Sequence, residues 1–384
     1  MIFHSNTAGR EQEVAHLWEE CFPEDSREYI DWLMASKYDP ALCRALEEDG
    51  RLVALLHLLP LKLRLVGKDV DLPFVYGAGT LNAYRKRGYM RELLKESFKY
   101  QREAGHSCMA LYPFQYGFYR KTGFGLLNEC ATLEMAAADI LAESRHWQQP
   151  AGEMTPLSPE DMLSVWSKGI RRLEVGPVRN LERCRLRLEE WQCDGGSSLC
   201  CRVGGEAGGY ALFAPFEGKL EIEEIFYADG ETLIAMLLTL ANVAQTTDCA
   251  VLRCELPKDE FPHHMFSDSR KRVFLEPHAM FRILDVPALM SGLETPAKGS
   301  FCIRVEDGLC PWNDDTFTVT CEDGKMTVVP GGRPDSRCDV ATLSSLVCGS
   351  LDARSAKALG LFESENPAAL IAFSRRKAFF FEHY

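Results

Sequence analysis

The chain has 384 residues, of which 46% are apolar and 26% charged, a composition typical of a globular protein with room for two or three domains. Its formal net charge of -13 argues against general nucleic-acid binding, which requires Lys and Arg at the phosphates, and is compatible with a cationic substrate. The stretch MIFHSNTAGREQEV lacks the apolar core of a secretory signal, and the longest apolar run, LVALLHLLPLKLRLV, is interrupted by His57, Pro60 and charges. We therefore expect neither a signal peptide nor a membrane span.

The first 130 residues alternate helix and strand signals. Apolar residues recur at helical spacing in EQEVAHLWEECF, and Ser26 is placed to cap a second helix, SREYIDWLMASKY. An Asp-Gly turn between two apolar runs predicts a β-hairpin at 49–50, and the strand PFVYGAGTL follows. A helix is expected from about Tyr89 to Ala104, with Gly105 as its stop.

A second mixed pattern runs from about 150 to 283. SPEDMLSVWSKGI begins with a capping signature, GGYALFAPF, LEIEEIFY and CAVLRCELP predict strands, and ETLIAMLLTLANVAQ predicts a helix. The order repeats that of the first region, but the helix after IEEIFY begins with ADGE and has no basic turn. From about 284 onward, hairpin-like strands precede two helices, near TLSSLVCGSL and ARSAKALGLF, and the sequence ends in KAFFFEHY.

The fifteen cysteines are scattered, without a CxxC pair or any spacing typical of zinc sites. Disulfide frameworks belong mainly to small domains in oxidising compartments. We therefore expect reduced, mostly buried thiols in a cytoplasmic protein. Because the sequence also lacks metal motifs of the HExxH type, no metal site is predicted.

Positive charge is concentrated in NAYRKRGYMRELL, where Lys86, Arg87 and Arg91 surround Gly88 at the expected start of a helix. The first turn of a helix leaves backbone N–H groups unpaired, the helix dipole adds partial positive charge, and glycine allows close approach. Together these features predict a diphosphate site. The alternative is an ordinary solvated basic helix start.

The surrounding segment, VYGAGTLNAYRKRGYMRELL, resembles the cofactor motif of the GNAT acyltransferases. In that family an Arg/Gln-x-x-Gly-x-Gly/Ala turn wraps the pyrophosphate of acetyl-CoA; here it runs from Arg85 to Met90, with Met90 in place of Gly or Ala. LYPFQYGFYRKTGFG, MFRILDVPALMSGL and IRVEDGLCPWNDDTFTV are similar to the multidomain branch of the family typified by the mycobacterial enhanced intracellular survival protein.

The resemblance implies an α/β (α+β) protein with tandem GNAT folds, each a mixed sheet flanked by helices, followed by a sterol-carrier-like α+β domain. The implied domains are a catalytic acetyl-CoA-binding GNAT domain at 1–145, a GNAT-like domain without a cofactor motif at 146–283, and a sterol-carrier-like domain at 284–384. That last domain is expected to supply a C-terminal carboxylate to the active site.

Site residues follow from the same resemblance. It places a general acid at Tyr119, a base at the α-carboxylate of Tyr384, and acceptor-pocket residues at Phe22, Glu24 and Trp32. The residues implied at the pantetheine arm, acetyl group and diphosphate are Ala78, Gly79, Thr80, Lys86, Arg87, Gly88, Tyr89, Met90, Arg91, Phe114 and Gln115.

Each catalytic and acceptor-pocket residue also has a structural alternative. Tyr119 is equally a candidate core tyrosine beside Phe118, Trp32 and Phe22 are candidates for helix packing, and Glu24 for a solvated turn. The chain end could fray, but four aromatics in KAFFFEHY favour burial of the tail.

The implied activity is acetyl-CoA-dependent N-acetylation of a primary amine on a small cationic acceptor resembling an aminoglycoside, a polyamine or lysine. Transfer would be direct, in a ternary complex, without an acyl-enzyme, a metal, a nucleic acid or a membrane partner, and the branch implies a homo-oligomer. The alternative is a lipid or hydrophobic-ligand binding protein that uses the third domain. The intact basic turn favours the enzyme.

Overall fold

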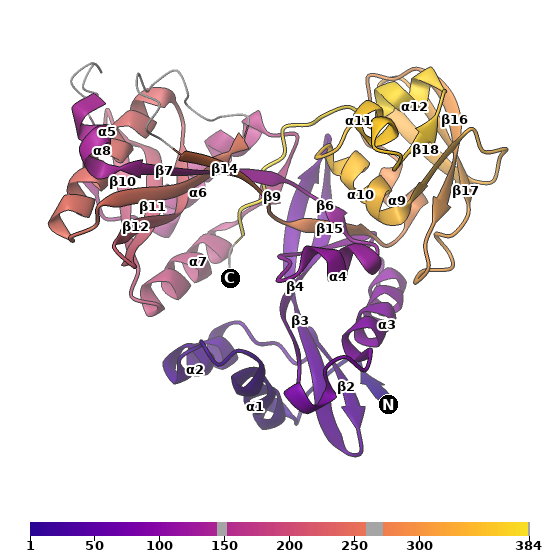
Figure 1. The fold of residues 1–384 in the computed structure, drawn as a ribbon, viewed down its shortest axis with the longest axis horizontal. Helices are drawn as coiled ribbons and strands as arrows, with labels where there is room; N and C mark the ends of the chain where they lie inside the picture. Colours follow the sequence, from indigo (N-terminus) through magenta and orange to yellow (C-terminus); the bar gives the residue numbers. More distant parts are fainter. Residues whose placement is uncertain (144–151, 259–271, 383–384) are drawn as a thin grey trace.

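The computed structural model describes residues 1–143, 152–258 and 272–382, which form three sheets with helices packed against them (Figure 1). The N-terminal region lies at the bottom of the view, the middle region at the upper left and the C-terminal region at the upper right. Among the described helices, none has the length and apolar character needed to cross a membrane.

The first sheet belongs mainly to the N-terminal region. Its strands are β1 (Ile2–His4), β2 (Cys43–Glu48), β3 (Arg51–Leu65), β4 (Lys68–Thr80), β5 (Cys108–Leu111), β6 (Gly125–Leu126), β9 (Val175–Val178) and β15 (Met280–Ile283). They are ordered β1-β2-β3-β4-β5-β15-β6, with β9 paired to β3. The accompanying helices are α1 (Glu11–Cys21), α2 (Arg27–Ser36), η1 (Asn82–Tyr84), α3 (Tyr89–Glu103) and α4 (Tyr116–Lys121).

Helices cover both faces of this sheet, which explains the long apolar run in β3. Leu17 of α1 belongs to the same buried cluster as Leu55, whereas Phe98 of α3 belongs to a second cluster with Leu56. Because neighbouring residues of a strand point to opposite faces, a strand covered on both sides must be apolar throughout. The hairpin expected at 49–50 is present, with positive φ at Asp49 (51°) and Gly50 (80°).

The second sheet has the order β14-β7-β13-β12-β11-β10-β8. Its strands are β7 (Glu129–Ala136), β8 (Glu153–Thr155), β10 (Ser197–Val203), β11 (Glu206–Phe216), β12 (Lys219–Tyr227), β13 (Val251–Pro257) and β14 (Arg272–Pro277). Its helices are α5 (Ala137–Glu143), α6 (Pro159–Gly169), η3 (Ile170–Arg172), α7 (Leu181–Cys193) and α8 (Gly230–Thr246).

The two sheets repeat one arrangement. In the first, β2, β3 and β4 are antiparallel neighbours, and α3 leads to β5, which is parallel to β4. In the second, β10, β11 and β12 are antiparallel, and α8 leads to β13, which is parallel to β12. The mixed sheets flanked by helices that the resemblance implies are thus present.

Strands cross the domain boundaries expected at 145 and 283. β7, from within 1–145, pairs with β13 and β14 of the second sheet. β15, from within 146–283, pairs with β5 and β6 of the first. Strand pairing across the predicted boundaries ties the two regions together, and the division at 145 and 283 stays a prediction.

The C-terminal region contains a third sheet, ordered β18-β17-β16-β19-β20. Its strands are β16 (Gly299–Glu306), β17 (Thr316–Glu322), β18 (Lys325–Pro330), β19 (Ser336–Asp339) and β20 (Glu363–Ser364). Its helices are α9 (Val286–Met290), α10 (Val340–Cys348), α11 (Ala353–Ala358) and α12 (Pro367–Ala372). α10 packs on β15 and β6, which joins this region to the first sheet.

As far as Glu382, the tail runs from the third region between the other two and approaches α7, where Glu382 pairs with Arg183 (Figure 1). Phe379, Phe380 and Phe381 are at most 1% exposed, and Phe380 stacks on Phe74 of β4 with ring centroids 5.5 Å apart. The backbone N–H of Phe379 donates to the Val175 carbonyl at 3.0 Å. The expected burial of the aromatic tail is confirmed for these residues.

A buried ion pair joins the first sheet to the third region and yields a stability prediction. Nη2 of Arg282, on β15, lies 2.7 and 2.8 Å from the carboxylate oxygens of Asp307, and both side chains are at most 2% exposed. Arg282→Ala leaves a buried carboxylate without its partner, so we expect the free energy of unfolding to fall by about 3–5 kcal/mol.

The matched control is the exposed pair Arg304–Asp314, with N–O separation 2.7 Å and side chains 31% and 44% exposed. Arg304→Ala should lower the free energy of unfolding by about 1 kcal/mol or less. Chemical denaturation measures both variants, and equal losses would contradict this account.

Candidate functional site

A cavity of about 460 Å³ opens beside the start of α3. The parallel strands β4 and β5 pair only at Phe74–Ala110 and Val75–Leu111 and then separate. The cavity lies where they separate. Its lining residues come from the end of α1, the end of β4, the basic turn with the start of α3, and the segment after β5. They are Cys21, Phe22, Glu24, Ala78, Gly79, Thr80, Tyr84, Arg85, Lys86, Gly88, Tyr89, Met90, Arg91, Phe114 and Phe118.

The basic turn presents an uncapped helix start to this cavity. Lys86 and Gly88 are left-handed, with φ of 62° and 87°, and Gly88 is the N-cap of α3. The first main-chain bond of the helix runs from Glu92 N–H to the Gly88 carbonyl at 3.0 Å. The N–H groups of the preceding turn therefore have no helical acceptor, and glycine has no side chain to cap them. This is the geometry that binds phosphate groups.

In the second sheet, a side chain caps the N-terminus of the corresponding helix, α8. Asp229 caps α8, and its Oδ1 accepts hydrogen bonds from both the N–H and the hydroxyl of Thr232 at 2.8 Å. A carboxylate therefore occupies the place where an anionic ligand would meet α8. The segment before α8, which has no basic turn in the sequence, therefore also lacks the uncapped helix start found at α3.

The basic side chains of the turn have different surroundings. Arg85, Lys86 and Arg91 line the cavity, and Nε of Arg85 also donates to the Thr80 carbonyl at 3.1 Å. Arg87 does not line it; its guanidinium lies over the Tyr84 ring, 5.5 Å from the centroid. The side chain of Met90 packs against the buried cluster under α3, so a residue larger than Gly or Ala is accommodated there.

The end of β4 is reshaped by a β-bulge. The pairing with β3 shifts register between Leu55 and His57, opposite Gly77, whose φ is 61°. A Cβ at Gly79 would lie 2.9 Å from Sγ of Cys21, so this glycine allows α1 to approach the strand. Bulges next to functional sites redirect backbone groups, and here the redirected segment lines the cavity.

Tyr119 lies behind the cavity wall rather than in it. It is 2% exposed, and its ring meets Phe114 edge-on with centroids 5.6 Å apart and Phe118 at 5.0 Å. Burial raises its pKa above the usual tyrosine value, so the phenol stays protonated at neutral pH. Phe114 is 76% exposed at the mouth, and Gln115, an exposed N-cap of α4, lies outside the lining.

The expected acceptor residues separate into two places. Phe22 and Glu24 line the cavity, whereas Trp32 does not. The Nζ of Lys37 lies over the Trp32 ring, 5.3 Å from the centroid, and pairs with Glu190 of α7 in a buried contact. Burial lowers the pKa of Lys37 to about 7, although Glu190 opposes the shift. Trp32 thus lies beside the lysine that joins the end of α2 to α7, and its place in the acceptor pocket stays a prediction.

Four lining residues were not among the expected site residues: Cys21, Tyr84, Arg85 and Phe118. Arg85 begins the turn motif, and Cys21 precedes Phe22 at the end of α1, so both were adjacent to expected positions. Tyr84 and Phe118 carry no sequence signal that separates them from packing aromatics.

The tail is fixed beside the segment that leads from β5 to this site. The N–H of Glu382 donates to the Tyr112 hydroxyl at 3.0 Å, and Tyr112 directly follows β5 on the way to Phe114. The Glu382 carboxylate lies 2.5 Å from Arg179 and 3.0 Å from Arg183. Burial alone would raise the pKa of Glu382, but the two guanidinium groups hold it below the usual value. Tyr384, the expected base, lies outside the described residues.

Comparisons with known proteins agree on two parts of the chain. Residues 3–127 match the acetyltransferase (GNAT) domain, and residues 286–381 match the sterol carrier protein domain. An uncharacterized N-acetyltransferase from Streptomyces avermitilis is 25% identical over 311 residues, covering 75% of this chain and 74% of that protein.

Two solved structures share the fold over the whole chain. A GCN5-related N-acetyltransferase from Anabaena variabilis superposes with a TM-score of 0.86 at 15% identity, covering 100% of both chains. Eis1 from Mycobacterium abscessus superposes with a TM-score of 0.81 at 18% identity, again covering 100% of both. At these identities the likeness concerns the fold.

The Thr80 hydroxyl allows a test of whether β4 binds acetyl-CoA through its backbone or through this side chain. Its Oγ1 is buried and has no hydrogen-bond partner among the described residues. Thr80→Val removes an unsatisfied polar group, so we expect the free energy of unfolding to stay equal or rise by about 1 kcal/mol. If ligands use the backbone of this strand, the affinity for acetyl-CoA should not change. Calorimetric titration with denaturation measures both, and a large loss of affinity would assign the role to the hydroxyl.

Proposed function

We propose that this protein transfers the acetyl group of acetyl-CoA to a primary amine of a small cationic acceptor. It is an acetyltransferase, because it carries a GNAT acetyltransferase domain. Toward its C-terminus it also carries a sterol carrier protein domain. The acceptor class is aminoglycoside-, polyamine- or lysine-like. Transfer is direct, in a ternary complex.

The observation that carries the proposal is the open start of α3 beside the separated strands. Gly88 leaves the first-turn N–H groups uncapped, and Lys86 and Arg91 add positive charge at the same place. A diphosphate fits this helix end, and a pantetheine arm fits the cavity between the end of β4 and the segment after β5. Ala78, Gly79 and Thr80 offer backbone groups to the arm.

Acetyl-CoA supplies the acetyl group as a thioester. The protonated acceptor amine first loses one proton, which we assign to the α-carboxylate of Tyr384, because the tail is buried as far as Glu382 and Glu382 is fixed beside Tyr112. The neutral nitrogen then forms a bond to the acetyl carbon as the carbon–sulfur bond breaks, and the second amine proton lost balances the one that the departing sulfur takes up. We assign Tyr119 as the general acid for the departing sulfur, because the resemblance places that role there and its ring packs against Phe114 and Phe118, which line the cavity.

The acceptor proposal rests on charge. Glu24 lines the cavity, and the formal net charge of the chain is -13, so the surface field attracts cations. All fifteen cysteines are free thiols, which supports a reducing, cytoplasmic location. A homo-oligomer remains part of the proposal by resemblance alone.

The alternative, a lipid carrier, has less support. Inward-facing residues of the third sheet, such as Phe301, Ile303 and Phe317, are buried in one cluster with Phe362 and Phe373. Two cavities at this region, of about 410 and 450 Å³, are lined mainly by charged and polar residues. Those linings do not suit a hydrophobic ligand.

Gly88→Val tests the cofactor site. The substitution imposes a side chain on a left-handed residue and adds a branched group where the diphosphate meets the helix. We expect the dissociation constant for acetyl-CoA to rise at least about tenfold, which corresponds to about 1.4 kcal/mol.

Gly105→Val is the matched control, because Gly105 lies just beyond the other end of α3 with φ of 92° and open space around its Cβ. It carries similar backbone strain away from the cavity, so its affinity should equal that of the parent. Calorimetric titration compares the three proteins, and equal affinity in a folded Gly88→Val protein would remove the assignment.

Tyr119→Phe tests the proposed donor. We expect the turnover number to fall by about 10²–10⁴-fold, the range for general acid groups, with acetyl-CoA affinity unchanged. Tyr116→Phe removes a hydroxyl from the same helix α4 at a side chain that is 37% exposed, in contrast to the buried Tyr119, and should retain parent turnover. Assays of thiol release compare the variants. Near-parent turnover in Tyr119→Phe would return the residue to a packing role.

A further inference from the structure

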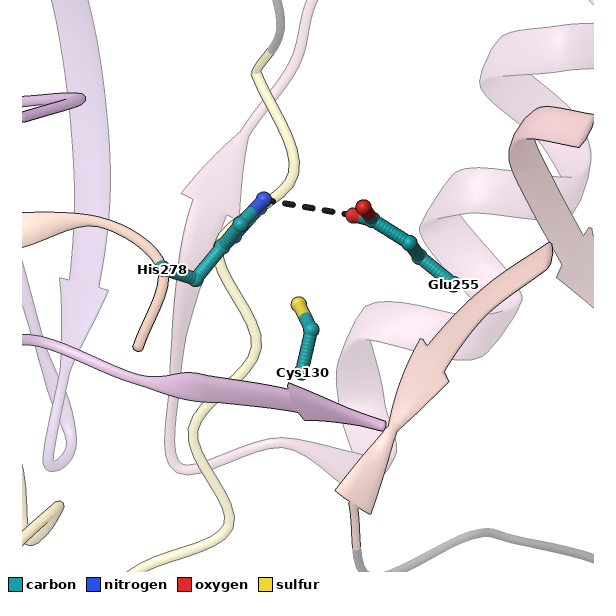
Figure 2. Close-up of side chains that lie close together, drawn as sticks. All are labelled: Cys130, Glu255 and His278. Atoms are coloured by element: carbon teal, nitrogen blue, oxygen red, sulfur yellow. Dashed lines mark ion pairs between the residues drawn. The ribbon is translucent and has the colours of Figure 1, made fainter. Parts of the chain in front are cut away.

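Three potential metal ligands converge at one end of three neighbouring strands of the second sheet, and none of them is among the residues that line the cavity beside α3 (Figure 2). Cys130 lies on β7, Glu255 on β13, and His278 directly follows β14. One sulfur, one carboxylate oxygen and one ring nitrogen lie within 4.8 Å of one another. His278 Nε2 is 3.3 Å from Oε2 of Glu255, the ion pair marked in Figure 2.

Sheet register places two of the ligands on one face. β7 and β13 are antiparallel, with Thr132 opposite Glu255. Cys130 is two residues from Thr132 along the same strand, so its side chain points to the same face, diagonally across from Glu255. The pairing of the strands therefore holds these ligands at a fixed separation.

His278 is oriented by groups around it. Its Nδ1 lies 3.1 Å from the Phe380 carbonyl, so a proton on Nδ1 donates to that oxygen and leaves the lone pair of Nε2 facing the other two ligands. Asn128 contacts both His278 and Cys130. Its main-chain carbonyl accepts a hydrogen bond from the main-chain N–H of His278 at 3.0 Å, and its side-chain amide lies 3.7 Å from Cys130 Sγ. Such second contacts accompany ligating histidines in metal sites.

We propose that Cys130, Glu255 and His278 bind a divalent metal ion of the zinc class. A sulfur, nitrogen and oxygen set suits zinc, whereas calcium and magnesium take oxygen ligands. Zinc bonds of about 2.0–2.3 Å in tetrahedral geometry place ligand atoms about 3.3–3.8 Å apart, so a closure of about 1 Å completes the set. A tetrahedral zinc ion held by three side chains takes water as its fourth ligand, and His278 and Glu255, with side chains 11% and 18% exposed, are within reach of solvent.

The charges of such a site balance. On binding, the Cys130 thiol proton and any proton on His278 Nε2 are lost to water, and the thiolate and carboxylate together neutralise the dication. Because His278 also holds the Phe380 carbonyl, the ion links the second sheet to the tail. Its role is to stabilise the position of the tail, and it takes no part in acetyl transfer.

The test uses the full chain carrying Cys193→Ser, because Cys193 is the exposed thiol and would compete for metal. Titration with Co²⁺ should give one equivalent of bound ion with a thiolate-to-cobalt charge-transfer absorption, displaced by Zn²⁺. Added Zn²⁺ should raise the melting temperature, and a chelator should reverse the rise.

Cys130→Ser should abolish both signals. Cys254→Ser is the matched control and should keep both signals. Cys254 is buried, as Cys130 is, and it lies next to Glu255 on β13 without belonging to the cluster. Absence of the absorption in the parent, or its persistence in folded Cys130→Ser, overturns the proposal and leaves an ion pair only. If Cys130→Ser does not fold, Glu255→Gln decides: affinity at least tenfold weaker supports the site, and unchanged affinity overturns it.

Discussion

The position of the tail depends on the buried guanidinium of Arg179. It lies 2.5 Å from Glu224 of β12 and 2.5 Å from Glu382 of the tail, and it donates to the Phe381 carbonyl at 2.6 Å. Taking these ions out of water costs several kcal/mol each, so they are tolerated only when every partner is in place. The tail therefore has one position, between the second sheet and the segment that follows β5.

This constraint connects a feature of the third region to a site in the first. Acetyl-CoA recognition needs only the open start of α3, which is local to the turn at Gly88. Proton removal from the acceptor, as we propose it, needs the tail, which begins more than 250 residues later in the chain. The corresponding helix of the second sheet, α8, has no open start of the same kind, because Asp229 caps it. The second sheet supplies Glu224, and with it the anchor for the tail.

Sequence reasoning succeeded where the signal was local. The turn at 49–50, the cap at Ser26 and the start of α3 at Tyr89 follow from residues within a few positions of each other. It failed where contacts join distant segments. At Trp32 nothing in the sequence indicated that Lys37, paired with Glu190 of α7, lies over the ring, and the place of Trp32 in the acceptor pocket stays a prediction. The convergence of Cys130, Glu255 and His278 has no spacing that a sequence motif would reveal.

The central claim is that the tail brings a carboxylate to the acetyl-CoA site, and the most direct test compares acetyl transfer by proteins extended at either end. A residue fused after Tyr384 converts its α-carboxylate into a neutral amide, whereas an N-terminal extension changes neither tail nor cavity. The account predicts that the C-terminal extension abolishes turnover while acetyl-CoA still binds with parent affinity, and that the N-terminal extension alters neither. Equal turnover by the two extended proteins would contradict it.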